Sequence, residues 1–308
     1  MTHPRLADLV ARARVLADSR PPVLALAFPC DTLALDAAQR IAQSGVARPL
    51  LVGPRDGILR AADAAGVDAK AFEIEATPDA ASEAARRACT LAREGVVQAL
   101  MKGSLHTDEL MSAVVSKTTG LRGSTRISHA FVFDLPRYHK LLALADCVVN
   151  IAPDLKTKRD ILGNAVGLLQ RLGVQHPKVG IVAAVESVNP AIPATLDAQA
   201  LVALSREGAW PGAVVEGPFG FDNVISAEAA RIKKMDSRVA GDADLLIMPD
   251  LNAGNMLYKS FNYIGGGDCA GLVLGASVPI VLTSRADSLQ SRLASVALAV
   301  LASSSPTA

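Results

Sequence analysis

The sequence predicts an α/β protein in which a mostly parallel sheet is flanked by helices. Short apolar runs alternate with Ala-rich helical patterns along most of the chain, as in repeated strand–helix units. Half of the 308 residues are hydrophobic but only 4% are aromatic, a composition that suits buried parallel strands under Ala-rich helices. The length favours two domains over one.

The elements expected in the first part of the chain follow this alternation. Asp31 is placed to cap a helix that runs to Gln43, and Gly45 stands just past its end. Pro78 falls in the first turn of a second helix, where proline is tolerated. The predicted strands are Pro22–Phe28, Pro49–Val52, Ala71–Glu75 and Val96–Met101, and the predicted helices are 31–43 and 78–93.

A different pattern begins near residue 127. Two apolar runs, His129–Phe133 and Leu141–Asn150, are separated by a turn too short for a helix, so we expect them to pair antiparallel and to open a second domain. Later strands are predicted at 178–185, 213–216, 244–248, 270–274 and 279–282, and helices at 157–172, 197–204, 227–234, 255–263 and 288–301. The last strand–helix unit is short and is expected to return to the first domain. The first domain would then comprise 1–135 plus 276–308, and the second 136–275.

Charge and cysteine content exclude several classes of protein. The net charge of +1 gives no reason to expect nucleic-acid binding. The four cysteines are far apart and show no C-x-x-C spacing, which favours reduced thiols over disulfides or a zinc site. No apolar run approaches the ~18 residues that span a bilayer, and the first residues lack the apolar core of a signal peptide. We therefore expect a cytoplasmic protein without a membrane or nucleic-acid partner.

One predicted strand end suits an anion. The apolar run 243–248 ends at Pro249 and is followed by a glycine turn and a helical pattern from Asn255. Backbone N–H groups at such a helix start favour a bound anion, and the amides of Asn252 and Asn255 add polar groups beside Gly254. A simple strand-to-helix turn is the other interpretation.

A second predicted strand end carries Ser284 and Arg285. The planar guanidinium of arginine can hold two phosphate oxygens together, and the serine hydroxyl adds a donor. Asp287, two residues further on, is open to three interpretations: a helix cap, a group that orients Arg285, or a proton acceptor. Together the two strand ends predict an enzyme that acts on a phosphorylated or acidic metabolite.

Two further segments are candidates for phosphate contact. Lys102 and Ser104 flank a glycine at the end of the strand 96–101, and Arg126 lies on a loop rich in hydroxyl groups. A solvated turn and a solvated basic loop remain open as alternatives, and Lys158 is interpreted as part of a solvated helix face. The sequence has no P-loop pattern, no nucleophile elbow and no dinucleotide fingerprint after a predicted strand.

Three stretches carry a resemblance to a known family. They read V-E-G-P-F-G-F-D-N-V-I-S at 215–226, D-S-R-V-A-G-D-A-D-L-L-I-M-P-D-L-N-A-G-N-M-L-Y-K at 236–259, and P-I-V-L-T-S-R-A-D at 279–287. In these residues the chain resembles the phosphate acetyltransferase and phosphate butyryltransferase family. Weaker similarity covers 101–104, 128–136 and 144–153.

The resemblance implies a fold and an activity. The fold is two α/β domains, similar to isocitrate and isopropylmalate dehydrogenases, with the active site in the cleft between them, and the enzyme is usually a homodimer. The activity is reversible transfer of a short acyl group between coenzyme A and inorganic phosphate, with acyl phosphate as product. Coenzyme A is a substrate, and no metal or redox cofactor is implied.

The same resemblance assigns residues. Ser284 and Arg285 match the active-site serine and arginine of the family, and Arg126 stands where a second phosphate-binding arginine is expected. The acetyl enzymes have an aspartate where this chain has Ser291, so Asp287 is the nearest candidate for a base. The remaining expected substrate-binding residues are Lys102, Ser104, Asn252, Gly254 and Asn255.

Two other functions remain open at this stage. The first is a metal- and NAD-dependent decarboxylating dehydrogenase, for which Asp236, Asp242 and Asp244 are the clustered carboxylates. The second is a non-catalytic relative that binds a small molecule. Within the transferase interpretation, the acyl chain length stays open, because each methylene changes binding by only about 1 kcal/mol.

Overall fold

The computed structural model describes residues 3–282 and 287–303. Contacts divide the chain into two compact units. Among the described residues, the amino-terminal unit comprises Leu6–Ile127 and 270–303, and the central unit comprises Ser128–Cys269 together with 3–5. Both are mixed α/β structures with mostly parallel strands and flanking helices, which confirms the predicted fold class. In the described part of the chain, no helix is long and apolar enough to cross a membrane.

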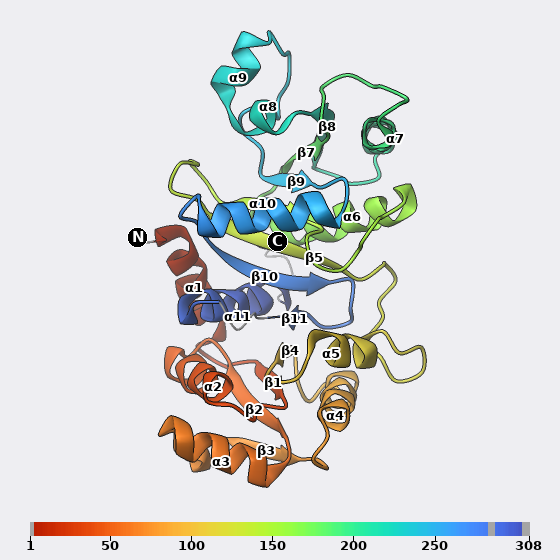
Figure 1. The fold of residues 1–308 in the computed structure, drawn as a ribbon. Helices are drawn as coiled ribbons and strands as arrows, with labels where there is room; N and C mark the ends of the chain where they lie inside the picture. The colour runs from red at the N-terminus through yellow and green to blue at the C-terminus, as the bar shows by residue number, and fades with distance from the viewer. Residues whose placement is uncertain (1–2, 283–286, 304–308) are drawn as a thin grey trace. The chain divides into compact units, whose positions relative to one another are not determined.

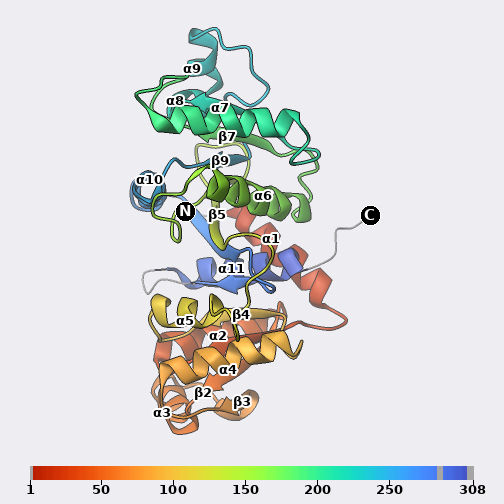
Figure 2. The ribbon, with the colours of Figure 1, turned by 90° about the vertical axis from the view of Figure 1, so that its right-hand side faces the viewer.

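The amino-terminal unit contains a sheet in the order β3-β2-β1-β4-β11-β10, in which all strands but β10 are parallel. Helices α2, α3 and α11 lie on one side of this sheet, and α4 and α5 lie on the other (Figures 1 and 2). Its strands are β1 (Val23–Ala27), β2 (Arg48–Gly53), β3 (Glu73–Ala76), β4 (Ala99–Lys102), β10 (Asp268–Leu274) and β11 (Ile280–Val281). Its helices are α1 (Pro4–Ala17), α2 (Thr32–Ser44), α3 (Arg55–Ala65), a 3-10 turn (Ala69–Ala71), α4 (Ala81–Arg93), α5 (Thr107–Val114) and α11 (Leu289–Ser303).

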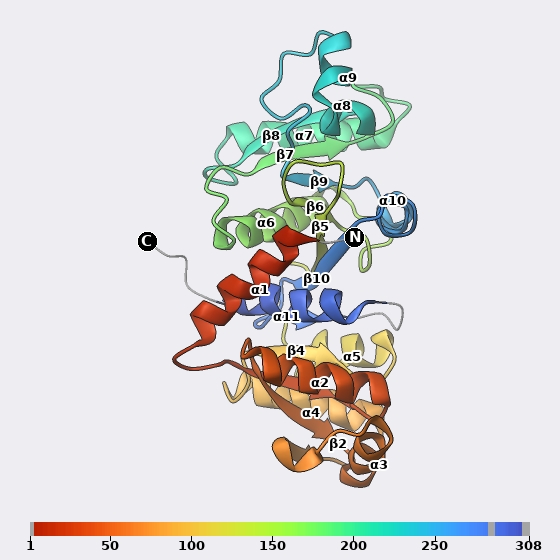
Figure 3. The same ribbon diagram turned by 90° about the vertical axis from the view of Figure 1, so that its left-hand side faces the viewer.

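The central unit contains strands in the order β5-β6-β9-β7-β8. Strands β5 and β6 pair antiparallel, as predicted, and β6, β9, β7 and β8 are parallel. Helices α6 and α7 cover one face, and α8, α9 and α10 lie on the other (Figures 1 and 3). The strands are β5 (Ser128–Asp134), β6 (Leu142–Ala145), β7 (Lys178–Val182), β8 (Val214–Phe219) and β9 (Leu245–Ile247). The helices are α6 (Leu155–Arg171), α7 (Pro193–Arg206), α8 (Phe221–Ile225), α9 (Ala227–Ile232) and α10 (Leu251–Tyr263).

Local sequence signals explain several of these elements. Helix α2 begins where the side chain of Asp31 accepts a hydrogen bond from the backbone N–H of Ala34, at 2.8 Å. It ends at Gly45, which has a φ of 72°, a left-handed conformation that glycine adopts without strain. Both ends of this helix therefore agree with the sequence prediction.

Lys158 is a correction to the sequence analysis. Its side chain on α6 is buried and its Nζ lies 2.6 Å from Oδ2 of Asp197 on α7. The packing of α7 against α6 supplies this carboxylate, and a buried lysine needs such a partner. Lys158 is therefore part of the helix interface and not of a solvated face.

Because the parallel strands of each unit run in one direction, their carboxyl ends share one edge of the sheet. Ligands of open α/β sheets bind at that edge. In the amino-terminal unit the edge includes the end of β4, and in the central unit it includes the segment between β9 and α10. Most of the predicted site residues follow these strand ends.

Candidate functional site

In the amino-terminal unit, the chain after β4 passes very close to the end of β1. A β-carbon at Gly103 would lie 2.4 Å from the carbonyl oxygen of Ala27 and 2.7 Å from that of Phe28. Only glycine fits such an approach without a shift of the backbone. Gly103 thus fixes the path of the two flanking candidates, Lys102 and Ser104.

The hydroxyl of Ser104 joins two strand ends. It donates to the carbonyl oxygen of Phe28 and accepts from the N–H of Cys30, both at 2.7 Å. The ammonium group of Lys102 donates to the carbonyl oxygens of Gly103 and Leu105, at 3.3 and 3.0 Å. Both side chains therefore hold the turn after β4 in addition to any contact with a substrate.

Strand β11 ends beside the end of β4, at the same edge of the sheet. It pairs parallel with β4, with Ile280 opposite Leu100 and Val281 opposite Met101. Ser284 and Arg285, which follow β11 in the sequence, lie outside the described residues.

Asp287 precedes helix α11 and is half-buried. The cap of this helix is Ser288, whose hydroxyl accepts from the N–H of Ser291 at 2.9 Å. The interpretation of Asp287 as the helix cap is therefore wrong, because the helix starts one residue later than that role requires. Arg126, on the segment before β5, is exposed.

In the central unit, helix α10 begins at Leu251, earlier than the sequence analysis predicts. Asp250 caps it, since its Oδ1 accepts from the N–H of Ala253 at 3.0 Å and its carbonyl oxygen accepts from the N–H of Gly254 at 3.1 Å. The expected glycine turn with free N–H groups is therefore wrong. Asp250 already accepts from two of the N–H groups at this helix start, and its negative charge there opposes an anion.

Gly254 and Asn255 instead attach α10 to the turn after β6. A β-carbon at Gly254 would lie 2.5 Å from the carbonyl oxygen of Asp146. The side-chain amide of Asn255 donates to the carbonyl oxygen of Cys147 at 3.2 Å. Asn252 is exposed near the start of the helix. Two of the predicted residues thus position the helix, and the third faces solvent.

The buried carboxylate of Asp146 organises this turn. Its Oδ1 accepts from the N–H groups of Val148 and Val149, at 2.8 and 3.0 Å. Its Oδ2 accepts from the side-chain amide of Asn150 at 2.6 Å and from the N–H of His129 at 3.2 Å. Four donors compensate the burial of this charge.

His129 is a residue that the sequence analysis missed. Its side chain is buried on β5, and its backbone N–H donates to the carboxylate of Asp146. The sequence did contain a signal for it: His129 lies in an apolar run predicted to be a buried strand, where an ionisable side chain is uncommon.

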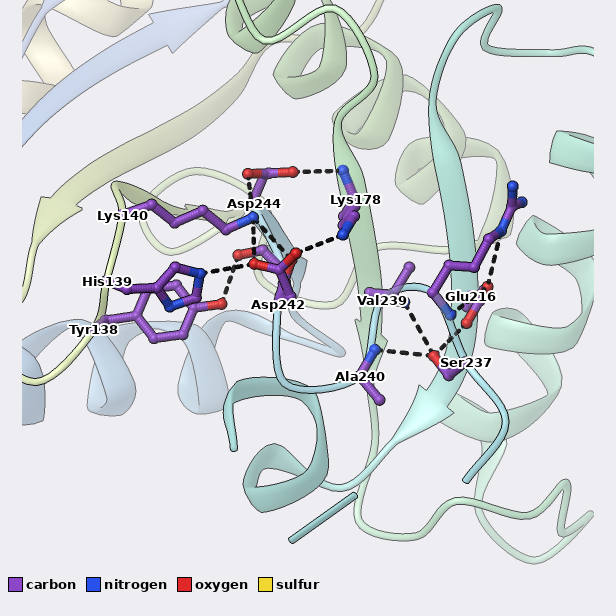
Figure 4. Close-up of polar contacts among 12 residues, drawn as sticks. Tyr138, His139, Lys140, Lys178, Glu216, Ser237, Val239, Ala240, Asp242 and Asp244 are labelled. Carbon is purple, nitrogen blue, oxygen red and sulfur yellow. Dashed lines mark hydrogen bonds and ion pairs between the residues drawn. The ribbon is translucent and has the colours of Figure 1, made fainter. Parts of the chain in front are cut away.

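At the opposite edge of the central sheet, Asp242 and Asp244 form ion pairs (Figure 4). The carboxylate of Asp242 is bonded by Lys140, Lys178 and His139, and Lys140 also reaches Asp244 at 2.7 Å. Burial alone would raise the pKa of Asp242, but hydrogen bonds from Lys178, Lys140 and His139 hold that pKa well below its usual range. These carboxylates lie at the amino ends of β7 and β9. Because lysine side chains already neutralise them, they do not suit the metal site of a dehydrogenase.

Comparisons with known proteins agree with this architecture. A branched-chain phosphotransacylase from Enterococcus faecalis V583 superposes with a TM-score of 0.81 at 28% identity, covering 92% of this chain and 99% of that protein. A 4-hydroxythreonine-4-phosphate dehydrogenase from Burkholderia phymatum, at a TM-score of 0.55 and 15% identity, shares the fold alone; it covers 92% of this chain and 98% of that one. The fold is therefore that of the phosphotransacylases and of related dehydrogenases.

The sequence comparisons define the family. Residues 65–300 match the family described as phosphate acetyl/butaryl transferase. A phosphate acetyltransferase of Rhizobium meliloti is 48% identical over 293 residues, covering 95% of this chain and 92% of the relative. A phosphate butyryltransferase of Clostridium acetobutylicum is 38% identical over 278 residues, covering 90% and 92%. This chain belongs to the phosphate acetyl/butyryl transferase family.

Proposed function

We propose that this protein catalyses the reversible transfer of a short acyl group between coenzyme A and inorganic phosphate. The observation that carries the proposal is the family match over residues 65–300, together with relatives of both the acetyl and the butyryl type. The dehydrogenase alternative is not favoured, because Asp242 and Asp244 are paired with lysines at the amino ends of β7 and β9, whereas ligands of open α/β sheets bind at the carboxyl ends.

The reaction requires a phosphate group to be held close to a thiol. The thiolate of coenzyme A attacks the acyl carbonyl, and phosphate leaves, or the reverse. In the proposal, Arg285 and Arg126 neutralise the phosphate, which improves it as a leaving group and reduces its repulsion of the thiolate. Ser284 donates a hydrogen bond as charge develops on the substrate, and Asp287 accepts a proton or orients Arg285.

The parallel pairing of β11 with β4 supports this assignment. Strand β11 ends beside the end of β4, near which Lys102 and Ser104 lie, and Ser284 and Arg285 follow β11 in the sequence. Lys102 and Ser104 remain proposed substrate-binding residues on this ground. Asn252, Gly254 and Asn255 remain proposed as a second group, for which the start of α10 provides the frame.

We also propose direct transfer in a complex with both substrates, because the family resemblance supplies no covalent nucleophile. Orientation of two bound substrates then contributes much of the rate. The proposal further includes a cytoplasmic homodimer that uses no metal or redox cofactor. Light scattering and activity in the presence of a chelator test these two points.

One assay tests the function. The protein is incubated with phosphate and, separately, with acetyl-, propionyl- and butyryl-coenzyme A, and released thiol is measured. We expect phosphate-dependent release with at least one of them, and the relative kcat/KM values give the chain length. Tight binding of coenzyme A without phosphorolysis of any of the three would support a non-catalytic relative instead.

A further inference from the structure

The imidazole of His129 is a buried polar group without a partner. Only 1% of the residue is exposed, and neither Nδ1 nor Nε2 makes a hydrogen bond within the described residues. Buried polar atoms of native proteins are nearly always paired with protein or water, so an orphan of this kind calls for an explanation. A neutral imidazole offers one donor and one acceptor, and both are left open here.

The position of His129 follows from the strand register. His129 directly precedes the pair Ala130–Ala145, and alternation along the strand places it on the same face of β5 as Phe131 and Phe133. That face packs against α10: the Phe131 ring stacks on Tyr258 at 4.1 Å between centroids, and Phe133 contacts Phe261 at 5.2 Å.

The same spacing places His129 beneath the first turns of α10. Phe133 contacts Phe261, and Phe131, two residues earlier on the strand, contacts Tyr258, three residues earlier on the helix. His129 is two residues earlier again, so the helix residues nearest to it are expected to be Gly254 and Asn255. The Gly254–Asp146 approach and the Asn255–Cys147 hydrogen bond agree with this placement. The imidazole therefore lies at the carboxyl edge of β6 and β9, where open α/β sheets bind ligands.

Asp146 is close to His129 but does not pair with its ring. Both carboxylate oxygens are already used by four other donors, one of which is the backbone N–H of His129. Burial lowers the pKa of His129 to about 4, while the charge of Asp146 acts in the opposite direction. The ring is thus neutral at physiological pH.

These surroundings select the kind of ligand group that completes the site. A phosphate dianion would be repelled by the carboxylate of Asp146 and would be poorly solvated beside the ring of Phe131, which lies 4.4 Å from the imidazole. An uncharged carbonyl oxygen is not repelled by Asp146 and loses less solvation energy than a phosphate. A short alkyl chain can pack against the aromatic side chains nearby.

We propose that the neutral imidazole of His129 donates a hydrogen bond to the carbonyl oxygen of the acyl group that is transferred. The inference rests on the proposed acyl-transfer function and adds an acyl-binding residue to it. The hydrogen bond polarises the carbonyl and strengthens as the oxygen gains negative charge during attack. His129 remains neutral throughout and takes no part in proton transfer.

Nuclear magnetic resonance of the intact protein labelled with ¹⁵N-histidine tests the contact directly. Acetyl-coenzyme A is added without phosphate, so that no turnover occurs, and coenzyme A alone and phosphate alone are added to parallel samples. We expect the ring nitrogens of His129 to shift only with acetyl-coenzyme A. The absence of a shift at saturating acetyl-coenzyme A, or an equal shift with coenzyme A or phosphate, would overturn the proposal.

Kinetics of matched variants give an independent test. His129→Phe is expected to reduce kcat/KM for acetyl-coenzyme A by ~10-fold or more with little change in the KM for phosphate, and His129→Gln, which keeps a donor, is expected to recover part of it. His176→Gln, at the other edge of the same unit, is the control and should keep the wild-type rate. An unchanged rate for a folded His129→Phe variant would contradict the proposal.

The two hypotheses fail differently. A wild-type protein that shows no phosphorolysis refutes the proposed function itself. If the wild-type protein is active but its His129 signals do not shift with acetyl-coenzyme A, only the proposed contact between His129 and the acyl group is refuted. If His129→Phe does not fold, the spectrum of the wild-type protein still decides.

Discussion

Gly254 of α10 lies so close to Asp146 that a β-carbon at residue 254 would be 2.5 Å from the Asp146 carbonyl oxygen. In the same turn, the carbonyl oxygen of Cys147 accepts a hydrogen bond from the side-chain amide of Asn255. The motif L-N-A-G-N therefore has a structural role: it holds the start of α10 against the turn after β6. Candidate substrate groups around this helix depend on that contact.

Gly254→Ala should destabilise the protein. The added methyl group meets rigid backbone, so α10 must move away from the turn, and we expect a loss of about 1–3 kcal/mol in the free energy of unfolding. Urea denaturation measures it. Gly167→Ala in α6 is the matched control, because the nearest atom to its added carbon is Nη1 of the Arg171 side chain at 3.8 Å. The control should be neutral or gain about 0.5–1 kcal/mol from helix propensity, and equal losses in the two variants would contradict the role of Gly254.

Ser104→Ala should also reduce stability. The substitution leaves the N–H of Cys30 without its acceptor and removes one donor from the carbonyl oxygen of Phe28. We expect a cost of about 1–3 kcal/mol, again measured by denaturation. Ser260→Ala on α10 removes an exposed hydroxyl that bonds only the preceding turn, and it should stay within about 0.5 kcal/mol of wild type. A Ser104→Ala variant with wild-type stability but greatly reduced turnover would show that the hydroxyl serves the substrate and not the strand ends.

Much of the fold could be predicted because its signals are local. Asp31 and Gly45 mark both ends of α2, and the short link between the apolar runs at 129–133 and 141–150 requires antiparallel pairing. Helices α3 and α5 were not predicted. They have only 11 and 8 residues, so the helical periodicity extends over few turns, and packing of their buried faces stabilises them more than propensity does.

The errors at the candidate site have a common cause. Gly254 was interpreted as a turn residue, because a glycine after a strand usually supplies backbone freedom. In the structure it lies inside α10 and is required by a neighbour more than 100 residues earlier in the chain, a contact that local patterns do not show. Lys158 was assigned to solvent for the same reason, since Asp197 becomes its partner only when α7 packs on α6.

His129 predicts how stability changes with pH. Its pKa is about 4 in the folded protein and ~6.5 when unfolded, so the unfolded chain takes up the proton first as the pH falls. The contribution of this group to stability is therefore full above pH ~6.5 and decreases down to pH ~4, by roughly 3 kcal/mol in total.

Denaturation of wild type and His129→Phe across pH 4–7.5 isolates the contribution of this histidine. The stability of wild type relative to His129→Phe should fall as the pH falls, because only the wild type loses this contribution. Asp242 does not interfere, because its lowered pKa makes both proteins lose the same stability as the pH falls through the unfolded value of an aspartate, ~3.9, and this shared loss cancels in the comparison. Parallel pH profiles for the two proteins would show that the imidazole does not titrate abnormally.

Arg285→Ala should lower turnover by ~10²-fold or more. In the proposed reaction the guanidinium neutralises the phosphate and stabilises charge that develops in the transition state, an interaction that alanine removes completely. Arg285→Lys keeps the charge but loses the planar fork, so its rate should fall between those of alanine and wild type. Arg231→Ala on α9 is the matched control, because that arginine is exposed and pairs with Glu228 within its own helix. Steady-state release of coenzyme A thiol measures all three. If Arg285→Ala retains the rate of the control, the phosphate is held by other cations, and the assignment by family resemblance must be abandoned.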